Sequence, residues 1–206
     1  MESVLEVYHW PYNPQEPVVC MDETTKQLTQ EVIAPLPPQP GRAERFDTLY
    51  RRNGVATIFM FFEPLSGWRR VEVTEGKTRQ DWAYQIKELL DVHYRSVHKI
   101  HLVLDNLNTH NGASLYEAFA PQEARRLLHR LEFHYTPKHG SWLNIAEIEL
   151  SILSRQCMDD YFESADELIT GIAVWASSRN EKKTGINWQF TTDDARIKLR
   201  KLYPTI

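Results

Sequence analysis

The segment KIHLVLDNLNTHNG, residues 99–112, gives the clearest indication of how this chain folds. Ile100, Leu102 and Leu104 belong to a short apolar run, and such a run bounded by turn residues predicts a buried β-strand. The run stops at Asp105, and mainly polar residues follow it. The sequence therefore predicts a strand that delivers one carboxylate to the start of a polar loop.

A second apolar run also ends at acidic residues. In PVVCMDETTKQL, residues 17–28, Asp22 directly follows the apolar part. Functional groups of open α/β sheets gather at the carboxyl ends of strands, so Asp22 and Asp105 lie side by side if these strands are neighbours. Two ionised carboxylates held close together are unfavourable unless a cation bridges them or one of them is protonated. The pair therefore favours Mg²⁺ or Mn²⁺, which prefer oxygen ligands.

A third acid is expected from the helix that follows the last strand. The segment SWLNIAEIEL, residues 141–150, offers Glu147 and Glu149. Two residues that are two positions apart on a helix point about 200° away from each other, so only one of these can reach a given site. We favour Glu147, because it shares a mostly apolar face that is expected to turn toward the sheet.

Each acid also has an ordinary structural interpretation. Taken alone, Asp22 is better explained as a residue that ends a strand and begins a turn, whereas the start of an Asx-turn explains Asp105 equally well. Glu147 fits a capping box in which Asn144 is the N-cap. Only the combination of two strand-end acids with one helix acid favours a metal site.

The remaining patterns predict a mixed sheet with helices on its faces, the α/β class. A proline-rich segment, residues 34–44, is expected to be an extended loop inside a single domain. The predicted order is β-β-β-α-β-α-β-α-α. Besides the two strands above, the expected strands are 55–64, 68–76 and 132–137, and the expected helices are 78–94, 114–131 with a break at Pro121, 143–158 and 164–180.

Composition limits the classes of function. With 24 Lys and Arg against 28 Asp and Glu, the net charge is −4, which argues against tight DNA binding by this chain alone. Cys20 and Cys157 form no CxxC motif and are expected to be free thiols in a reducing compartment. No apolar run approaches the length of a membrane span, and the first residues do not have the pattern of a signal peptide. We therefore expect a cytoplasmic protein without a membrane partner.

Three motifs, VVCMDETTKQL, LVLDNLNTH and HGSWLNIAEIELSILSRQ, together resemble those of one known family. The resemblance is to the DDE transposases of the IS630 group within the Tc1/mariner superfamily, and it covers nearly the whole chain. It also includes the segment RRNGVATIFMFFEPLSGWR, which lies between the first two motifs.

The resemblance implies an RNase H-like fold with a five-stranded mixed sheet in the order 3-2-1-4-5. It implies that Asp22, Asp105 and Glu147 are the catalytic acids and hold two Mg²⁺ or Mn²⁺ ions, about 4 Å apart, at one scissile phosphate. It further implies DNA partners, namely transposon ends and target DNA, and a homodimer in the active complex. The implied location is the bacterial cytoplasm, at the nucleoid when DNA is bound.

The chain departs from the family pattern in two respects. First, 41 residues lie between Asp105 and Glu147, which is more than is typical of the family. Second, full-length relatives carry N-terminal helix-turn-helix modules that recognise the ends of the element, and none fits before residue 22. We therefore expect residues 1–206 to be one catalytic domain without that DNA-binding region.

Five further residues are weaker candidates for the site. Asn106 and His110 are candidates for contacts with the acids or with phosphate, and Lys138 and His139 for contacts with DNA. Trp142 is a candidate for stacking on a base. Solvated loop residues, or a core tryptophan in the last case, are equally ordinary interpretations.

Three other functions compete with strand transfer. An RNase H-like nuclease would hydrolyse DNA without joining strands. A non-catalytic remnant would act as a binding or regulatory partner of an intact transposase. An unrelated α/β enzyme would require the motif matches to be accidental.

Overall fold

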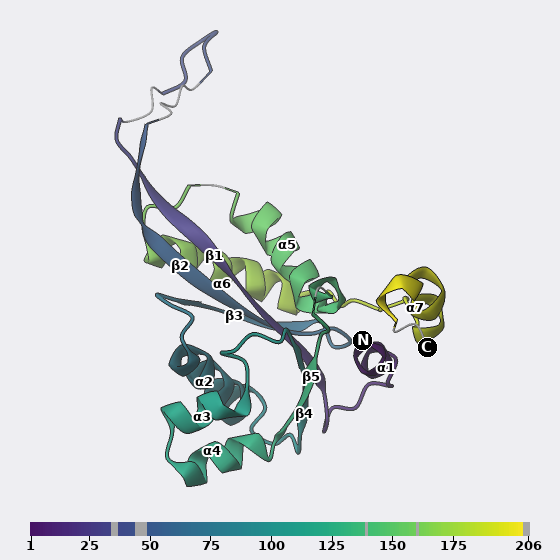
Figure 1. Cartoon of the computed structure of the whole chain (residues 1–206). Helices are drawn as coiled ribbons and strands as arrows, with labels where there is room; N and C mark the ends of the chain where they lie inside the picture. Colours follow the sequence, from purple (N-terminus) through teal and green to yellow (C-terminus); the bar gives the residue numbers. More distant parts are fainter. Residues whose placement is uncertain (34–36, 44–48, 139, 160, 204–206) are drawn as a thin grey trace.

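Five strands form one mixed sheet in the order β3-β2-β1-β4-β5 (Figure 1). The computed structural model describes residues 1–33, 37–43, 49–138, 140–159 and 161–203. β1 pairs antiparallel with β2 and parallel with β4; β2 and β3 form an antiparallel hairpin, and β4 and β5 are parallel. This confirms the predicted sheet order. The strands are β1 (Val18–Glu31), β2 (Tyr50–Glu63), β3 (Trp68–Thr74), β4 (Ile100–Leu104) and β5 (Leu131–Tyr135).

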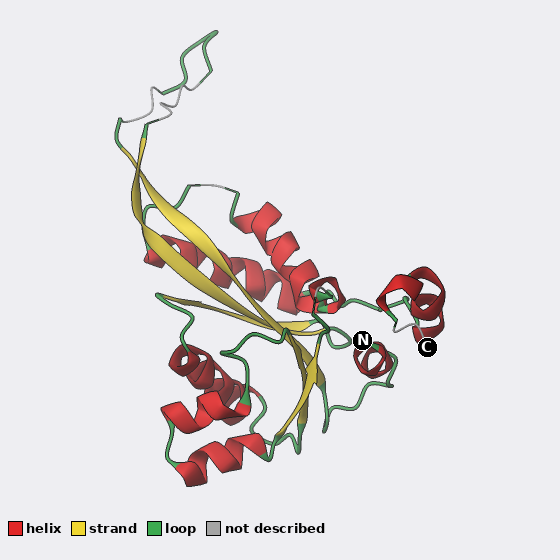
Figure 2. Ribbon diagram, in the orientation of Figure 1, coloured by secondary structure: helices red, strands yellow, loops and turns green. Residues whose placement is uncertain are grey.

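Helices cover both faces of the sheet (Figure 2). α2, α3 and α4 lie on one face, and α5 and α6 lie on the other, as Figure 1 shows. The α-helices are α1 (Glu2–Tyr8), α2 (Arg79–Glu88), α3 (Gly112–Ala118), α4 (Pro121–Leu128), α5 (Ile145–Cys157), α6 (Ala165–Glu181) and α7 (Thr192–Lys198). Shorter helical turns are the π-helical Leu89–His93 and the 3₁₀ segments Ser141–Leu143 and Arg200–Leu202.

Side-chain alternation divides the buried residues into two cores, one on each face. Cys20 and Val103 belong to the core beneath α5 and α6, whereas Met21 and Leu104 belong to the core beneath α2, α3 and α4. Successive residues of a strand point to opposite faces, so a central strand covered on both sides is buried at every position. All five residues of β4 are buried for this reason.

The structure differs from the predicted elements mainly in length. β1 extends past its expected end to Glu31, and β2 begins earlier than expected, at Tyr50. The reason is that their antiparallel pairing continues through polar residues as a two-stranded ribbon. The helix predicted over 78–94 ends as a π-helical turn, and the break at Pro121 is confirmed because α4 begins there. α1 and α7 were not predicted.

Two further expectations concern the proline-rich segment and membranes. Residues 34–36 and 44 of that segment lie outside the described residues, and its described part contains an isolated bridge between Gln39 and Arg42. No helix in the described part of the chain is long and apolar enough to cross a bilayer.

Candidate metal centre beside β1 and β4

The register of β1 and β4 brings the two predicted aspartates level with each other. The parallel pairing joins Val18 to His101 and Cys20 to Val103. Two residues further along each chain, the same register reaches Asp22 and Asp105. The pairing itself ends at Cys20 and Val103, so the register sets the two aspartates at the same level along the sheet without fixing the distance between their side chains.

Asp22 does not end its strand, contrary to the expectation from the sequence. β1 continues to Glu31, paired with β2, and only its pairing with β4 stops at Cys20. The strands separate at this point because β4 ends at Leu104 and the chain turns into the polar loop. Asp22 therefore lies where the sheet opens between two strands, and the alternative that it begins a turn is wrong.

α5 begins directly against this opening. Asn144 is its N-cap and accepts a hydrogen bond from the backbone N–H of Ala146 at 3.2 Å. The Asn144 amide also donates to the Met21 carbonyl at 2.8 Å and to Asp22 Oδ2 at 3.3 Å. One buried side chain thus caps the helix and connects it to β1 beside Asp22.

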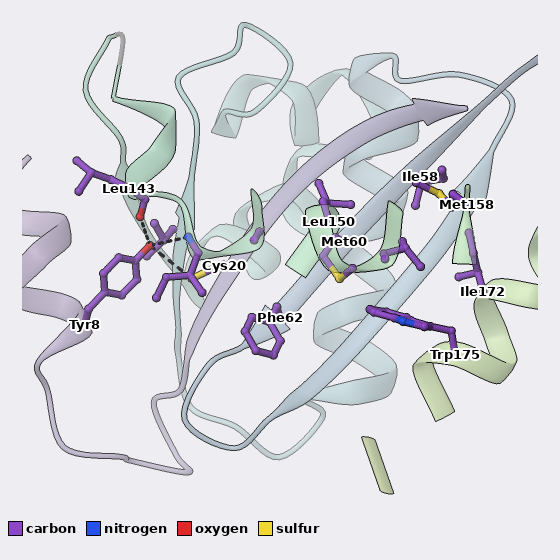
Figure 3. Packing of buried hydrophobic residues seen from close by; sticks show 14 of the residues in the cluster. Tyr8, Cys20, Ile58, Met60, Phe62, Leu143, Leu150, Met158, Ile172 and Trp175 are labelled. Carbon is purple, nitrogen blue, oxygen red and sulfur yellow. Dashed lines mark hydrogen bonds between the residues drawn. The ribbon is translucent and has the colours of Figure 1, made fainter. Parts of the chain in front are cut away.

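α1 reinforces the same junction from a distant part of the chain. The Tyr8 hydroxyl donates to the Leu143 carbonyl at 2.7 Å and accepts from the Ile145 N–H at 3.3 Å (Figure 3). The thiol of Cys20 on β1 lies 3.6 Å from the same hydroxyl. The start of α5 is therefore fixed on both sides of Asn144.

The two glutamates of α5 have different environments. Glu149 is fully buried and forms ion pairs with Arg69 at 2.8 Å and Arg179 at 2.7 Å. Glu147 is half-buried, and within the described residues its carboxylate accepts no hydrogen bond and forms no ion pair. Its expected capping box is not formed, because Asn144 accepts from Ala146 instead. Glu149 is therefore occupied as a structural residue, whereas Glu147 is available for other contacts.

The electrostatics of Asp22 indicate that several carboxylates share one site. Burial is the largest cause that raises the pKa of Asp22 to about 7, and the negative charges of Glu23, Asp105 and Glu147 raise it further. A backbone hydrogen bond from Glu23 at 2.8 Å partly offsets this effect. Because charge interactions weaken with distance, the combined effect indicates that the three predicted acids lie close together.

His110 links Asp105 to a second acid. Its Nδ1 lies 2.6 Å from Asp105 Oδ1, and its Nε2 lies 3.1 Å from Glu23 Oε2. Burial alone lowers the pKa of His110, but the contacts with Asp105 and Glu23 outweigh it and raise the pKa to about 9. His110 is therefore charged at neutral pH. For Asp105 burial raises the pKa, but the His110 contacts prevail and the pKa is lowered.

The Asx-turn expected for Asp105 is also present. The N–H of Leu107 donates to Asp105 Oδ1 at 3.4 Å. The loop is fixed further by Tyr135 on β5, whose hydroxyl donates to the His110 carbonyl at 2.9 Å. These contacts involve only Oδ1 of Asp105, and within the described chain its Oδ2 accepts no hydrogen bond.

The three predicted acids do not converge on a single point. Among the described residues, the one group of three His, Cys, Asp or Glu side chains whose ligand atoms all lie within 4.8 Å of one another is elsewhere. A site for two ions does not require such convergence, because the outer two acids can hold different ions. The structure thus brings Asp22, Asp105 and Glu147 into one region without placing them around one atom.

The weaker candidates have mixed outcomes. His110 is buried against Asp105, whereas Asn106 and Lys138 are exposed and His139 lies outside the described residues. Trp142 is 41% exposed, and its ring packs edge-on against Phe190 with 5.9 Å between ring centroids. Trp142 therefore keeps much of its ring accessible, and its expected contact with a base stays a prediction.

A comparison with known families supports the resemblance found in the motifs. Residues 17–169 match the family described as DDE superfamily endonuclease, and this segment contains all three predicted acids. The chain belongs to this family. No curated protein matches it.

Solved structures similar to this DDE family member include complexes of the Mos1 mariner transposase. The Mos1 mariner paired end complex with Mn has a TM-score of 0.54 and 13% sequence identity, and the match covers 89% of this chain and 54% of that one. The Mos1 strand transfer complex has a TM-score of 0.53 and 11% identity, covering 82% and 50%. The chain thus spans about half of the length of these proteins. At such low identity the likeness establishes the fold, which is RNase H-like.

Sequence reasoning missed Glu23, Tyr135 and Asn144 as residues that organise this candidate site. Glu23 follows Asp22 directly in MDETT, and strand alternation places it on the opposite face, where His110 is buried. Asn144 was recognised only as a helix cap. Its contact with Asp22 spans 122 residues of sequence, and no local pattern indicates such a contact.

Proposed function

We propose that this chain is the catalytic domain of an IS630-type DDE transposase. It would cleave DNA at the ends of a transposon and transfer the 3′-hydroxyl strand to target DNA. The observation that supports this most strongly is the β1–β4 register, which sets Asp22 level with Asp105 where the sheet opens. The motif order, from Asp22 through Asp105 and Asn106 to Glu147, supports the IS630 group.

The acids have the chemistry that a pair of Mg²⁺ or Mn²⁺ ions requires. The candidate ligands are all carboxylate oxygens, which hard divalent cations prefer. The raised pKa of Asp22 means that burial and negative charge oppose its ionisation in the free protein, and bound cations would remove this opposition. When bound, the two ions would activate the attacking oxygen and stabilise the leaving oxygen of the phosphodiester.

The residues of the chain position the acids for this role. Asp22 would bridge the ions, while Asp105 and Glu147 would each complete one of the two coordination shells. His110 and the loop amide occupy Oδ1 of Asp105, so Oδ2 is left for ligation. Asn144 holds Asp22 through its side chain and holds α5 through its cap, which fixes Glu147 relative to β1.

The proposed partners are DNA and a second copy of the chain. The Mos1 complexes described above are named as paired-end and strand transfer complexes, and we propose by analogy that this domain acts on two DNA ends as a homodimer. We further propose that it works at the bacterial nucleoid, as one catalytic domain. Recognition of the ends would require a separate DNA-binding region.

The deciding experiment measures Mg²⁺-dependent cleavage of duplexes taken from the sequence that flanks the reading frame. Asp105→Asn should lower cleavage by about 100-fold or more, since it removes charge from the reacting centre. The matched control is Asp193→Asn, because the Asp193 side chain is 86% exposed and lies on α7. Circular dichroism would verify that both variants are folded.

The products distinguish the proposed activity from its alternatives. Covalent joining of a 3′-hydroxyl end to a target plasmid supports a transposase, whereas cleavage without joining supports a plain nuclease. Absence of both cleavage and Mn²⁺ binding by calorimetry would support a non-catalytic remnant. Undiminished cleavage by Asp105→Asn would remove Asp105 from the mechanism.

A further inference from the structure

Two histidines and a glutamate form a second cluster of metal-binding side chains, away from the acidic site. His101 lies on β4, and Glu132 and His134 lie on the neighbouring β5, where His101 pairs in register with Glu132. His101 precedes Asp105 by four residues, which is roughly 13 Å at the rise of a strand. The cluster is therefore distinct from the proposed DDE centre.

The three ligand atoms form a nearly regular triangle. His101 Nδ1 lies 3.1 Å from His134 Nε2, and Glu132 Oε1 lies 3.8 Å from each of these two nitrogens. Ligand atoms bound tetrahedrally to zinc at about 2.0–2.1 Å are about 3.3–3.4 Å apart. The triangle thus needs only shifts of a few tenths of an ångström to fit one zinc ion, and each residue contributes a single atom.

The surroundings fix both imidazole rings and leave an entry path. The Trp10 indole packs edge-on against them, with ring centroids 4.9 Å from His101 and 6.0 Å from His134. His101 is 8% exposed, but it lines a surface hollow of about 340 Å³ that Trp10 and Glu16 also line. Rings held this way lose little freedom when they bind an ion.

The donor set also selects the kind of ion. The cluster offers two imidazole nitrogens and one carboxylate oxygen. Imidazole nitrogens suit Zn²⁺ and other transition metals, whereas Mg²⁺ prefers oxygen ligands. A set of two histidines and one glutamate is an established zinc ligand set with one position open to solvent.

We propose that His101, Glu132 and His134 bind one Zn²⁺ ion, with water as the fourth ligand. The ion would connect the edge strand β5 to β4 beneath the segment that follows α1. The competing explanation is a plain hydrogen bond between the two imidazoles, with Glu132 held by Lys99 at 3.2 Å. In that case the cluster would have no measurable affinity for zinc.

The test titrates zinc chloride into the chain by calorimetry, in an Asp105→Asn background with excess Mg²⁺ so that the acidic site does not compete. One equivalent of Zn²⁺ should bind. His134→Gln should weaken zinc binding strongly, because it removes a direct ligand. The loss should exceed the roughly 10- to 100-fold that is typical when a residue that only hydrogen-bonds to a ligand is removed. Glu132→Gln tests the same site with little risk to folding, because its side chain is 44% exposed.

The control is His98→Gln, which makes the same chemical change at a histidine outside the triangle. His98 is 78% exposed and forms an ion pair with Glu16 at 3.5 Å, so its loss should leave zinc binding unchanged. X-ray absorption of the zinc-loaded protein should show two imidazole nitrogens at about 2.0–2.1 Å. No zinc uptake, a shell of oxygen alone, or equal binding by His134→Gln and His98→Gln would overturn the proposal.

Discussion

At the scale of single residues, the proposed centre depends on which oxygens are already occupied. Asp105 uses Oδ1 for His110 and for the loop amide. Asp22 uses Oδ1 for the amide of Glu23, and its Oδ2 accepts a longer hydrogen bond from Asn144. Hydrogen bonds of this kind orient a carboxylate without using all of its acceptor capacity. The acids are thus oriented before any ion binds, as tight phosphoryl-transfer geometry requires.

Burial of Asp22 among other carboxylates should lower the stability of the metal-free chain once Asp22 is ionised. The pKa of Asp22 is about 7 in the folded state, against 3.8 for an ordinary aspartate. Between these values the unfolded chain loses the proton first, so stability falls as pH rises from about 4 to about 7. Asp22→Asn should therefore raise the metal-free Tm at pH 8 relative to the wild type, and the gain should vanish near pH 3.

Differential scanning fluorimetry with and without Mn²⁺ provides this measurement. Mn²⁺ should stabilise the wild type and have little effect on Asp22→Asn, because binding to the native state alone raises stability. A metal-free Asp22→Asn protein that is less stable than the wild type at pH 8 would contradict the prediction.

The two glutamates of α5 should respond oppositely to substitution. Glu149→Gln leaves the buried Arg69 and the partly buried Arg179 without their counter-charge, and breaking a buried ion pair costs about 3–5 kcal/mol. Glu147→Gln should change the free energy of unfolding little and should abolish cleavage. Urea denaturation together with the cleavage assay separates these effects. The reverse pattern would assign the catalytic role to Glu149.

At the scale of elements, the contact between α5 and β1 connects fold and function. β1 contributes Asp22 and α5 contributes Glu147, and Asn144 bonds to both elements. Tyr8 of α1 buttresses the same turn through the backbone on both sides of Asn144. Three elements that are distant in sequence thus set the relative position of two candidate ligands.

Asn144→Ala should reveal this connection. Loss of the cap alone costs about 0.5–2 kcal/mol, and the Met21 carbonyl also loses its buried partner. Cleavage should fall by more than the loss of folded protein explains, since Asn144 no longer holds Asp22 and the start of the helix that carries Glu147. Asn144→Ser retains a capping oxygen without adding a charge beside Asp22 and serves as the comparison for stability, which should be measured by chemical denaturation. Full activity in a stably folded Asn144→Ala protein would argue against this positioning role.

At the scale of the whole molecule, the net charge of −4 limits how this domain would meet DNA under the proposed function. Neutralisation of phosphates supplies most of non-specific affinity, and this chain has no excess of positive charge to provide it. Under the proposed function, DNA binding would therefore depend on bound cations or on an additional DNA-binding region. The acidic site itself repels phosphate until divalent ions are present.

Fluorescence anisotropy with a labelled duplex should therefore detect only weak binding by this chain at about 0.15 M salt, no tighter than the 10⁻⁴–10⁻⁶ M typical of non-specific binders. Mn²⁺ should strengthen duplex binding by the wild type, and the increase in affinity caused by Mn²⁺ should be smaller for Asp105→Asn. Nanomolar binding in the absence of divalent ions would show that a basic surface, rather than the metal centre, governs association.

The residue pattern by itself predicted the strands and the two aspartates that follow apolar runs, because alternation and apolar run length are local properties of the chain. The order of the strands in the sheet came from the family resemblance of the motifs, and the structure confirms it. The side-by-side placement of the two aspartates also followed, since it needs only the neighbouring arrangement of β1 and β4. The sequence favoured Glu147 over Glu149, and only the tertiary structure shows that Glu149 is held in ion pairs, because Arg69 and Arg179 reach α5 from β3 and α6. Only the tertiary structure likewise showed that His101 and His134 are neighbours. They lie on two separate strands, so their contact depends on which strands pair and not on a periodic pattern in the sequence.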